Sequence, residues 1–516
     1  MSSNLFRSSG VVSLMTLVSR LLGFVRDVLQ ASLFGAGAAM DVFFVAFRIP
    51  NLFRRLFAEG AFQQAFVPVL TETRNTRSPA EVRALVDVVS GTLGGFLLLF
   101  TAVAVIAAPL LMGAFAPGFA DDPEKFEQGV RLLRWTFPYL MFMSLAALVS
   151  GILNAYGKFA IPALTPVWLN IVMIAAALLY APSVEALAIA VFFAGIVQLL
   201  FQLPAVAKLG LLPRPRWGWH DPQVRRIITL MIPIVFGASV QQVSLLLDSI
   251  IASFLPGQGS VSWLWFADRL MEFPLGTFSI AIATVILPSL AGHHARNSAE
   301  EFSDTLDWAL RAVVLLGLPA TVGLFVLAGP IVSTLFQHSE FTVTDVGQTA
   351  WALMAYALGF LGFSFVKILI PGFYARQQTR APIRFCVIAL VCGMLLSAGF
   401  TLSLLAMDFV APHAGIALAT AISAWINACL LARALYRERV WCPRREWRVF
   451  LLRVGIANLV MAMVLAWTAG SLEGWTSAPA MVRAGRLAAT IVAAAVAYFA
   501  LLYAMGMRPA RYLRRT

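Results

Sequence analysis

The sequence predicts an all-α polytopic membrane protein of fourteen transmembrane helices. We expect two six-helix lobes, related by a pseudo-two-fold axis along the membrane normal, followed by two C-terminal helices. Three observations predict this fold class: an apolar composition, a one-sided distribution of positive charge, and an internal repeat. The 516 residues are 60% hydrophobic and only 12% charged. This composition excludes a water-soluble fold, because soluble domains carry about 25% charged residues.

Fourteen apolar stretches, bounded by glycine, proline or charge, are each long enough to span a bilayer, which takes roughly 20 residues. They fall near 11–34, 41–70, 87–110, 135–156, 161–181, 184–207, 227–255, 262–291, 308–328, 346–372, 384–405, 413–432, 450–470 and 485–506. The second and eighth stretches hold several charges and are the least typical of spanning helices. Together the stretches leave little of the chain for a soluble domain.

Positive charge is concentrated on one side of the predicted membrane. The chain has 38 Lys and Arg against 25 Asp and Glu, a net charge of +13. Over alternate loops, 26 of the 38 basic residues lie on the side of the N-terminus, five on the opposite side and seven inside spans. Because cytoplasmic loops hold the excess of Lys and Arg, both termini are predicted to be cytoplasmic. The same rule explains the excess of basic over acidic residues, so this excess does not indicate a nucleic-acid partner.

An internal repeat relates the two halves of the chain. Ala-Phe-Arg at 46–48, followed by Pro-Val-Leu at 68–70, recurs as Ala-Asp-Arg at 267–269, followed by Pro-Ser-Leu at 288–290. Since the copies are six predicted helices apart, they enter the membrane in the same orientation, which indicates two lobes. The predicted organisation is an N-terminal lobe over 1–215, a C-terminal lobe over 216–440, and two helices with a basic cytoplasmic tail over 441–516.

Thirteen charged residues fall inside the predicted spans. A charge at a helix centre costs about 2.5–3.5 kcal/mol even on permissive insertion scales. Thirteen such residues facing lipid would exceed the stability of a domain, so they must face a wet cavity or one another. The cations are Arg20, Arg26, Arg48, Arg54, Arg55, Arg269 and Lys367, and the acids are Asp27, Asp41, Glu59, Asp248, Asp268 and Glu272.

The first two spans carry more cations than acids. Five arginines stand against three acids, which leaves a net charge of +2 in apolar surroundings. Unpaired cations at membrane depth indicate an anion-binding site. The candidate anion contacts are Arg20, Arg26, Arg54 and Arg269.

Several of the other charges have two interpretations that the sequence leaves open. Asp41, Arg48, Arg55 and Glu59 are separated by 7, 7 and 4 residues and share one helix face. This spacing fits a structural ladder of ion pairs as well as a substrate contact. Two further acids, Asp268 and Glu272, flank Arg269 and are expected to orient it.

Asp248 is a lone acid in the seventh stretch, near Gln241, Ser244 and Ser249. It is a candidate cation or proton site, and the alternative is a carboxylate capped by hydroxyls or protonated in place. Lys367 is either a substrate contact or the partner of an acid across the cavity. The four cysteines show no CxxC spacing, so no metal site, disulfide or cofactor is expected.

Four segments carry a resemblance to a known family. They are SRLLGFVRD (19–27), DVFFVAFRIPNLFRRLFAEGAFQQAFVPVL (41–70), SVSWLWFADRLMEFPLGTFSIAIATVILPSL (260–290) and ILIPGFYARQQTRAP (368–382). With these segments the chain resembles the MurJ/MviN family of lipid II flippases, within the multidrug/oligosaccharidyl-lipid/polysaccharide exporter superfamily. The similarity runs from about residue 7 to the C-terminus.

The resemblance implies fourteen helices, two lobes and a central cationic cavity in the bacterial inner membrane. It implies a transporter and not an enzyme, which moves the undecaprenyl-diphosphate-linked peptidoglycan precursor (lipid II) from the cytoplasmic to the periplasmic leaflet by alternating access. Lipid II and membrane lipid are the expected partners, and a monomer is expected. Contact with the cell-wall synthesis machinery stays open.

The resemblance also assigns roles to the charged residues. It places the family's cavity arginines, the substrate contacts, at Arg20, Arg26, Arg54 and Arg269, and its cavity aspartate at Asp41. Arg48 stands at a position where Lys would also be acceptable, and this departure keeps the charge. A sodium ion proposed for some members is not carried over, because the stretch 384–405 lacks Asp and Asn. The supporting cavity charges are Asp27, Arg48, Arg55, Glu59, Asp268, Glu272 and Lys367.

Three alternatives remain beside this interpretation. A cation-coupled multidrug exporter or another polyprenyl-linked oligosaccharide exporter belongs to the same superfamily, but cationic drugs require an anionic cavity. A membrane-embedded glycosyltransferase acting on lipid II requires catalytic carboxylates facing a roomy loop. The acidic cluster at 121–127 lies in a short loop without His or a DxD pair. A structural scaffold would tolerate loss of the cavity arginines.

Overall fold

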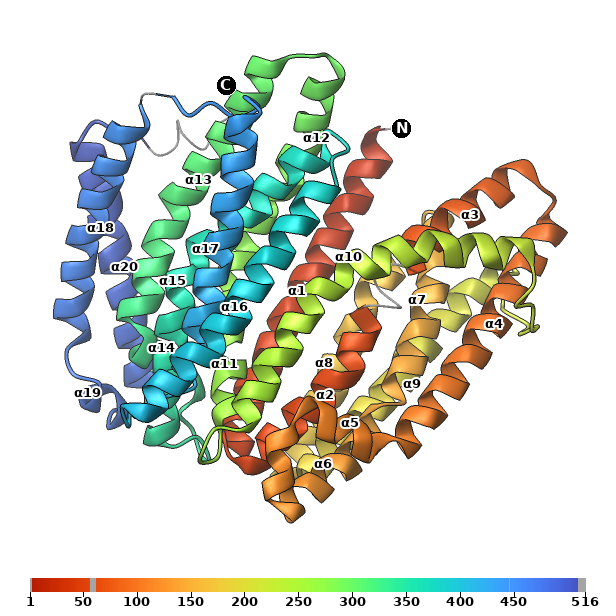
Figure 1. The fold of residues 1–516 in the computed structure, drawn as a ribbon, viewed down its shortest axis with the longest axis horizontal. Helices are drawn as coiled ribbons and strands as arrows, with labels where there is room; N and C mark the ends of the chain where they lie inside the picture. The colour runs from red at the N-terminus through yellow and green to blue at the C-terminus, as the bar shows by residue number, and fades with distance from the viewer. Residues whose placement is uncertain (1, 56–61, 445, 509–516) are drawn as a thin grey trace. The chain divides into compact units, whose positions relative to one another are not determined.

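The computed structural model describes residues 2–55, 62–444 and 446–508, and every regular element among them is a helix (Figure 1). Ten helical segments in this part of the chain are apolar and long enough to cross a membrane. The predicted all-α membrane fold is therefore confirmed, whereas the count of fourteen spans stays a prediction. By its internal packing the chain forms two compact units, unit 1 (residues 1–261) and unit 2 (residues 262–516). The predicted boundaries at 215/216 and 440/441 remain predictions.

Unit 1 contains the first ten α-helices and one 3-10 turn. They are α1 (Ser2–Phe34), α2 (Ala38–Arg54), α3 (Gln63–Thr76), α4 (Pro79–Ile106), α5 (Ala108–Phe115), η2 (Pro117–Asp121), α6 (Pro123–Thr136), α7 (Tyr139–Ala155), α8 (Ala160–Tyr180), α9 (Val184–Lys208) and α10 (Pro222–Ser253). Within the unit, α1 packs on α8, α2 packs on α6, and α10 packs on α3, α4 and α5.

Unit 2 contains the remaining helices and one π-helical turn. They are α11 (Ser260–Pro274), which begins just before the unit boundary, η3 (Leu275–Ser279), α12 (Ile280–Ala295), α13 (Ala299–Val326), α14 (Ala328–Phe336), α15 (Val343–Tyr374), α16 (Arg380–Ala406), α17 (Ala414–Arg437), α18 (Trp447–Ala469), α19 (Glu473–Thr476) and α20 (Ala480–Ala504). The last two long helices pack on each other, α18 also packs on α13, and α20 also packs on α14.

The first residues of several helices recur at a constant offset along the chain, as the internal repeat predicts. Helices α1, α4, α5 and α8 begin 220 residues before α10, α13, α14 and α16, at 2 and 222, 79 and 299, 108 and 328, and 160 and 380. Two of these partners, α4 and α13, are both 28 residues long. The repeat that two short motifs predicted therefore extends over the secondary structure of the first and second halves of the chain.

The two charge-rich stretches contain several helical elements. The second stretch forms α2 and α3, which lie on either side of residues outside the described part of the chain, and the eighth forms α11, the π-helical turn η3 and α12. Pro50 inside α2 has no N–H for the carbonyl of Ala46, and Thr136 Oγ1 on α6 donates to that carbonyl at 2.8 Å. A proline inside a span frees a backbone carbonyl, which a membrane protein tolerates where another group satisfies it.

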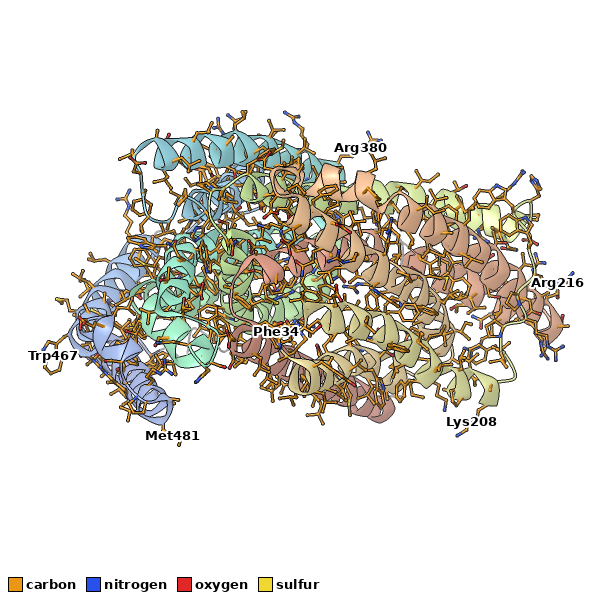
Figure 2. All side chains as sticks on the ribbon, turned by 90° about the horizontal axis from the view of Figure 1, so that it is seen from below. Phe34, Lys208, Arg216, Arg380, Trp467 and Met481 are labelled. Atoms are coloured by element: carbon orange, nitrogen blue, oxygen red, sulfur yellow. The ribbon has the colours of Figure 1, made fainter. Side chains whose placement is uncertain are left out.

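The connection between α9 and α10 lies tightly against α4. The Arg214 N–H donates to Asp87 Oδ1 at 2.7 Å, and the Arg216 N–H donates to the Asp87 carbonyl at 3.0 Å. A Cβ atom on Gly91 would lie 2.3 Å from the Arg216 backbone nitrogen, so only glycine allows this approach. Lys208 and Arg216 lie at the same end of unit 1 (Figure 2), on the side that the charge distribution predicts to be cytoplasmic.

Candidate functional site

Arg26 lies in the contact between α1 and α8. Its Nε and Nη2 donate to Asp27 Oδ1 at 3.1 and 2.7 Å, and its Nη1 donates to Asn170 Oδ1 at 3.0 Å. The Asn170 amide in turn donates to the Ser19 carbonyl at 3.0 Å. Both ionic residues are buried, with 8% of Arg26 and 4% of Asp27 exposed. Two predicted site residues thus form a buried ion pair on α1, and Asn170 joins this pair to α8.

Arg20, six residues earlier on the same helix, is exposed. It lines a cavity of about 470 Å³ between α1, α3, α7, α8 and α9 of unit 1. Uncharged polar side chains line much of this cavity, among them Gln63, Asn154 and Gln202. Arg20 is the single charged residue in the lining that the structure describes. The site combines one accessible guanidinium with neutral hydrogen-bonding groups, an arrangement that suits a phosphate bonded to an uncharged polar group.

Asp41 is buried in the first turn of α2, with 2% of its surface exposed. Its Oδ2 accepts a hydrogen bond from the Gly259 N–H at 2.8 Å and lies 3.9 Å from Lys125 Nζ. The Lys125 ammonium also lies 4.2 Å from the centre of the Phe119 ring. A carboxylate at a helix N-terminus is stabilised by the helix dipole. These contacts anchor the residues before α11 and the first turn of α6 to the start of α2.

Arg48 of α2 contacts α10. Its Nη1 donates to Ser249 Oγ, next in sequence to Asp248, and Ser249 Oγ donates to the Leu245 carbonyl at 2.9 Å. Asp248 is half-buried, and the question of a cation site there stays open. In the parts of the chain that the structure describes, no cluster of three or more His, Cys, Asp or Glu side chains is placed to hold a metal ion.

Arg54 and Arg55 end α2. Arg54 is half-buried, and its Nε donates to Asn51 Oδ1 at 2.9 Å, while the Asn51 amide donates to the Phe47 carbonyl at 2.9 Å. Arg55 is the exposed C-cap residue. Glu59 lies outside the described residues, so the proposed ladder between it and Arg55 stays a prediction. Asn51 therefore acts as a hydrogen-bonding group within its own helix and holds Arg54 there.

In unit 2, Arg269 is held by its own helix. Its Nη1 donates to Glu272 Oε2 at 2.6 Å, and its guanidinium carbon lies 4.7 Å from the centre of the Trp265 ring. The side chains of Arg269 and Glu272 are 27% and 47% exposed, so the pair is open to its surroundings. Asp268 is half-buried beside them, and Lys367 on α15 is exposed. The expected orienting role of Glu272 agrees with this geometry.

Three partners of the charged residues escaped sequence reasoning. They are Asn170, Lys125 and Ser249, which contact Arg26, Asp41 and Arg48. Asn170 carried a usable signal, because it is the single amide in the apolar stretch 161–181 and polar residues inside spans are expensive. Lys125 carried none, since the sequence predicts it to be one of several charges in an outer loop, whereas the structure places it in α6.

Comparisons with known proteins agree with this arrangement. A family model described as "Lipid II flippase MurJ" matches residues 30–482. The "Probable lipid II flippase MurJ" of Vibrio cholerae is 46% identical over 98% of this chain and 97% of its own length. The "Lipid II flippase MurJ" of Burkholderia cenocepacia is 40% identical over 99% of both chains.

Solved structures show the same likeness. A "Lipid II flippase MurJ, inward closed conformation" aligns with 95% of this chain and 99% of its own, at a TM-score of 0.78 and 25% identity. An inward-facing multidrug resistance MATE family transporter of the MOP superfamily aligns with 83% of this chain at a TM-score of 0.63. The MATE transporter is only 15% identical, so this second likeness concerns the fold alone.

Proposed function

The chain belongs to the MurJ family of lipid II flippases, which are multi-pass inner-membrane transporters and not enzymes, and we propose a mechanism and a set of binding residues for it. In this proposal lipid II moves from the cytoplasmic to the periplasmic leaflet by alternating access, and both termini are cytoplasmic. A monomer carries out transport. The proposed contacts of the substrate's phosphates are Arg20 and Arg54 in unit 1, and Arg269 is a proposed substrate contact in unit 2, while Arg26 adds positive charge beside Arg20 on α1.

The single observation that carries the proposal is the state of Arg20. Its exposed guanidinium lines a cavity whose other polar side chains are uncharged. A guanidinium presents five N–H donors in a planar fork that matches the oxygens of a phosphate. Arg26 takes a positioning role in this scheme. Its bonds to Asp27 and Asn170 engage three of the five donors and fix the guanidinium in place.

The substrate explains why such a cationic cavity is needed. A diphosphate joined to sugars and a peptide cannot enter hydrocarbon, whereas a polyprenyl tail never needs to leave it. The protein therefore supplies a polar route that stays open toward the lipid. Rocking of two repeat-related lobes would expose this route to each leaflet in turn. An inside-negative membrane potential favours outward movement of anions by about 2.3 kcal/mol per charge per 100 mV.

The remaining predicted residues support this surface. Asp27 fixes Arg26 and Glu272 fixes Arg269, at 2.7 and 2.6 Å. Asp41 anchors the start of α2 through Gly259, at 2.8 Å. We propose no role for Asp248 beyond its position beside the Arg48 contact.

The superfamily alternative of a cation-coupled drug exporter has no supporting observation in this chain. A cationic drug needs an acidic site, and the cavity in unit 1 has Arg20 as the single charge in its described lining. The relatives that align with nearly the whole chain are named lipid II flippases.

The test is transport by purified protein in proteoliposomes loaded with fluorescent lipid II in the inner leaflet. Appearance of lipid II in the outer leaflet is read with an impermeant quencher, with and without an inside-negative potential. We expect transport by the wild-type chain and loss of transport in Arg20→Ala. Arg131→Ala is the matched control, since Arg131 forms exposed pairs with Glu127 and Glu185 at 3.2 and 3.5 Å. Equal transport by Arg20→Ala and wild type would remove Arg20 from the mechanism.

A further inference from the structure

We propose that the cavity beside Arg20 in unit 1 binds the sugar directly bonded to the diphosphate of the substrate, with Gln202 as a specificity-determining contact. The inference rests on the proposed function, because it takes Arg20 as a phosphate contact. It goes beyond that function by assigning the neutral part of the same cavity to an uncharged group that carries hydroxyls and an amide.

Gln202 on α9 is the strongest evidence. The residue lines the cavity, yet 0% of its surface is exposed. Its Oε1 accepts a hydrogen bond from Ser150 Oγ at 2.9 Å, whereas its Nε2 has no hydrogen-bond partner within the described residues. A buried amide donor without a partner is costly in free energy. A ligand hydroxyl or carbonyl oxygen in the cavity would relieve that cost.

The rest of the lining favours a neutral polar ligand. Gln63 and Asn154 add amide groups on α3 and α7, and Ser150 adds a hydroxyl. The described lining contains no carboxylate, so it offers nothing to a cation. It contains one cation, Arg20, which the phosphate occupies in the proposed function. Hydroxyl and amide groups of a sugar match these donors and acceptors, as in other small-molecule sites with a few convergent polar groups.

The covalent order of the substrate places the sugar in this cavity. The first sugar is bonded to the diphosphate itself, so a phosphate on Arg20 brings that ring into the neighbouring space. The peptide is farther from the diphosphate, and its carboxylates would find no second cation in the described lining. The volume of about 470 Å³ lies in the range of small-molecule sites.

The experiment compares two ligands on the wild type and on variants of the purified full-length protein. The ligands are lipid II and undecaprenyl diphosphate, which lacks the sugars and the peptide, and equilibrium binding is measured in detergent. We expect the wild type to bind lipid II more tightly. Gln202→Leu should weaken lipid II binding about tenfold and leave undecaprenyl diphosphate binding unchanged, since one hydrogen-bonding partner of the sugar is lost.

Gln198→Leu is the matched control. Gln198 lies one turn earlier on α9 and is equally buried, at 0% exposed, but its Nε2 donates to the Thr165 carbonyl at 3.0 Å and it is not part of the cavity lining. It should leave the ratio of the two affinities unchanged. Gln63→Leu, at a half-buried position in the cavity, provides a second test if Gln202→Leu fails to fold.

Each outcome separates the inference from the proposed function. An unchanged affinity ratio in Gln202→Leu, or in Gln63→Leu if that variant is needed, would overturn the sugar site. Equal binding of both ligands by the wild type would also overturn it, while the phosphate contact would stand. Failure of Arg20→Ala to weaken undecaprenyl diphosphate binding would contradict the proposed function instead.

Discussion

The two arginines of α1 differ more than their shared helix suggests. Arg26 is 8% exposed and forms three hydrogen bonds with Asp27 and Asn170. Arg20 is exposed and lines a polar cavity. Six residues turn a helix by about 240°, so the two side chains leave it on different faces. Arg26 packs against Asn170 of α8 as part of the fold, whereas Arg20 faces a cavity that a ligand can enter.

This difference separates two uses of a charge at membrane depth. A charge that is paired and hydrogen-bonded when buried becomes part of helix packing, and removing one partner leaves the other uncompensated. A charge on the wall of a cavity is solvated until a ligand replaces the water. Mutation of Arg26 should therefore change the stability of the fold, and mutation of Arg20 should change ligand binding.

The largest effect is expected from Arg26→Ala. This change leaves the Asp27 carboxylate, which is 5% exposed, without its guanidinium. Breaking a buried pair costs about 3–5 kcal/mol in the free energy of unfolding. We expect a strongly lowered melting temperature of the detergent-purified protein and low yield in the membrane. A variant that melts like the wild type but fails in transport would show that Arg26 acts on the substrate more than on the fold.

Arg20→Ala should give the opposite pattern. Loss of a charge-assisted contact to a phosphate corresponds to about 1.5–3 kcal/mol, or roughly 10- to 100-fold weaker binding of undecaprenyl diphosphate. The melting temperature should stay close to that of the wild type, because the side chain is exposed. Arg20→Lys should keep part of the binding, since it keeps the charge and loses the planar fork. A large loss of stability in Arg20→Ala would erase the distinction between the two arginines.

Much of this picture was accessible from the sequence. Composition and apolar stretches were sufficient for the all-α membrane fold, because the cost of burying charge in lipid restricts where charges can occur. The motifs at 46–48 and 267–269 indicated a repeat that the helix bounds carry at an offset of 220 residues. The free-energy cost of a charge in lipid also identified Arg20 and Arg26 as candidate site residues.

The sequence did not distinguish Arg20 from Arg26, for a physical reason. The hydrogen bonds between helices depend on residues that are distant in the chain: Asn170 lies 144 positions after Arg26, and Ser249 lies 201 positions after Arg48. Helical periodicity gives the face of a side chain but not the helix opposite it. It placed Asp41 and Arg48 on one face, whereas the structure shows Asp41 in contact with Lys125 and Gly259.

Arg269→Lys tests whether the open arginine of unit 2 behaves like Arg20. The guanidinium of Arg269 stacks at 4.7 Å on the Trp265 ring, a contact of about 0.5–2 kcal/mol that a lysine reproduces poorly. We expect transport in proteoliposomes to fall about three- to tenfold with little change in melting temperature. If Arg269→Lys instead unfolded the protein, Arg269 would belong with Arg26 among the structural cations.

The smallest effect on stability is expected from Glu272→Gln. This substitution compares the acid of the exposed pair in unit 2 with Asp27, the acid of the buried pair in unit 1. Glu272 is 47% exposed and pairs with a partly exposed arginine, so the ion pair should contribute less than about 1 kcal/mol to stability. Asp27→Asn is the matched change at the buried pair, and there we expect a clearly larger fall in melting temperature. Freed from its acid, Arg269 should bind undecaprenyl diphosphate at least as tightly as in the wild type. Equal destabilisation by the two substitutions would mean that Arg269 is as firmly built into the fold as Arg26, and the transport surface would then have to be assigned to Arg20 and Arg54 alone.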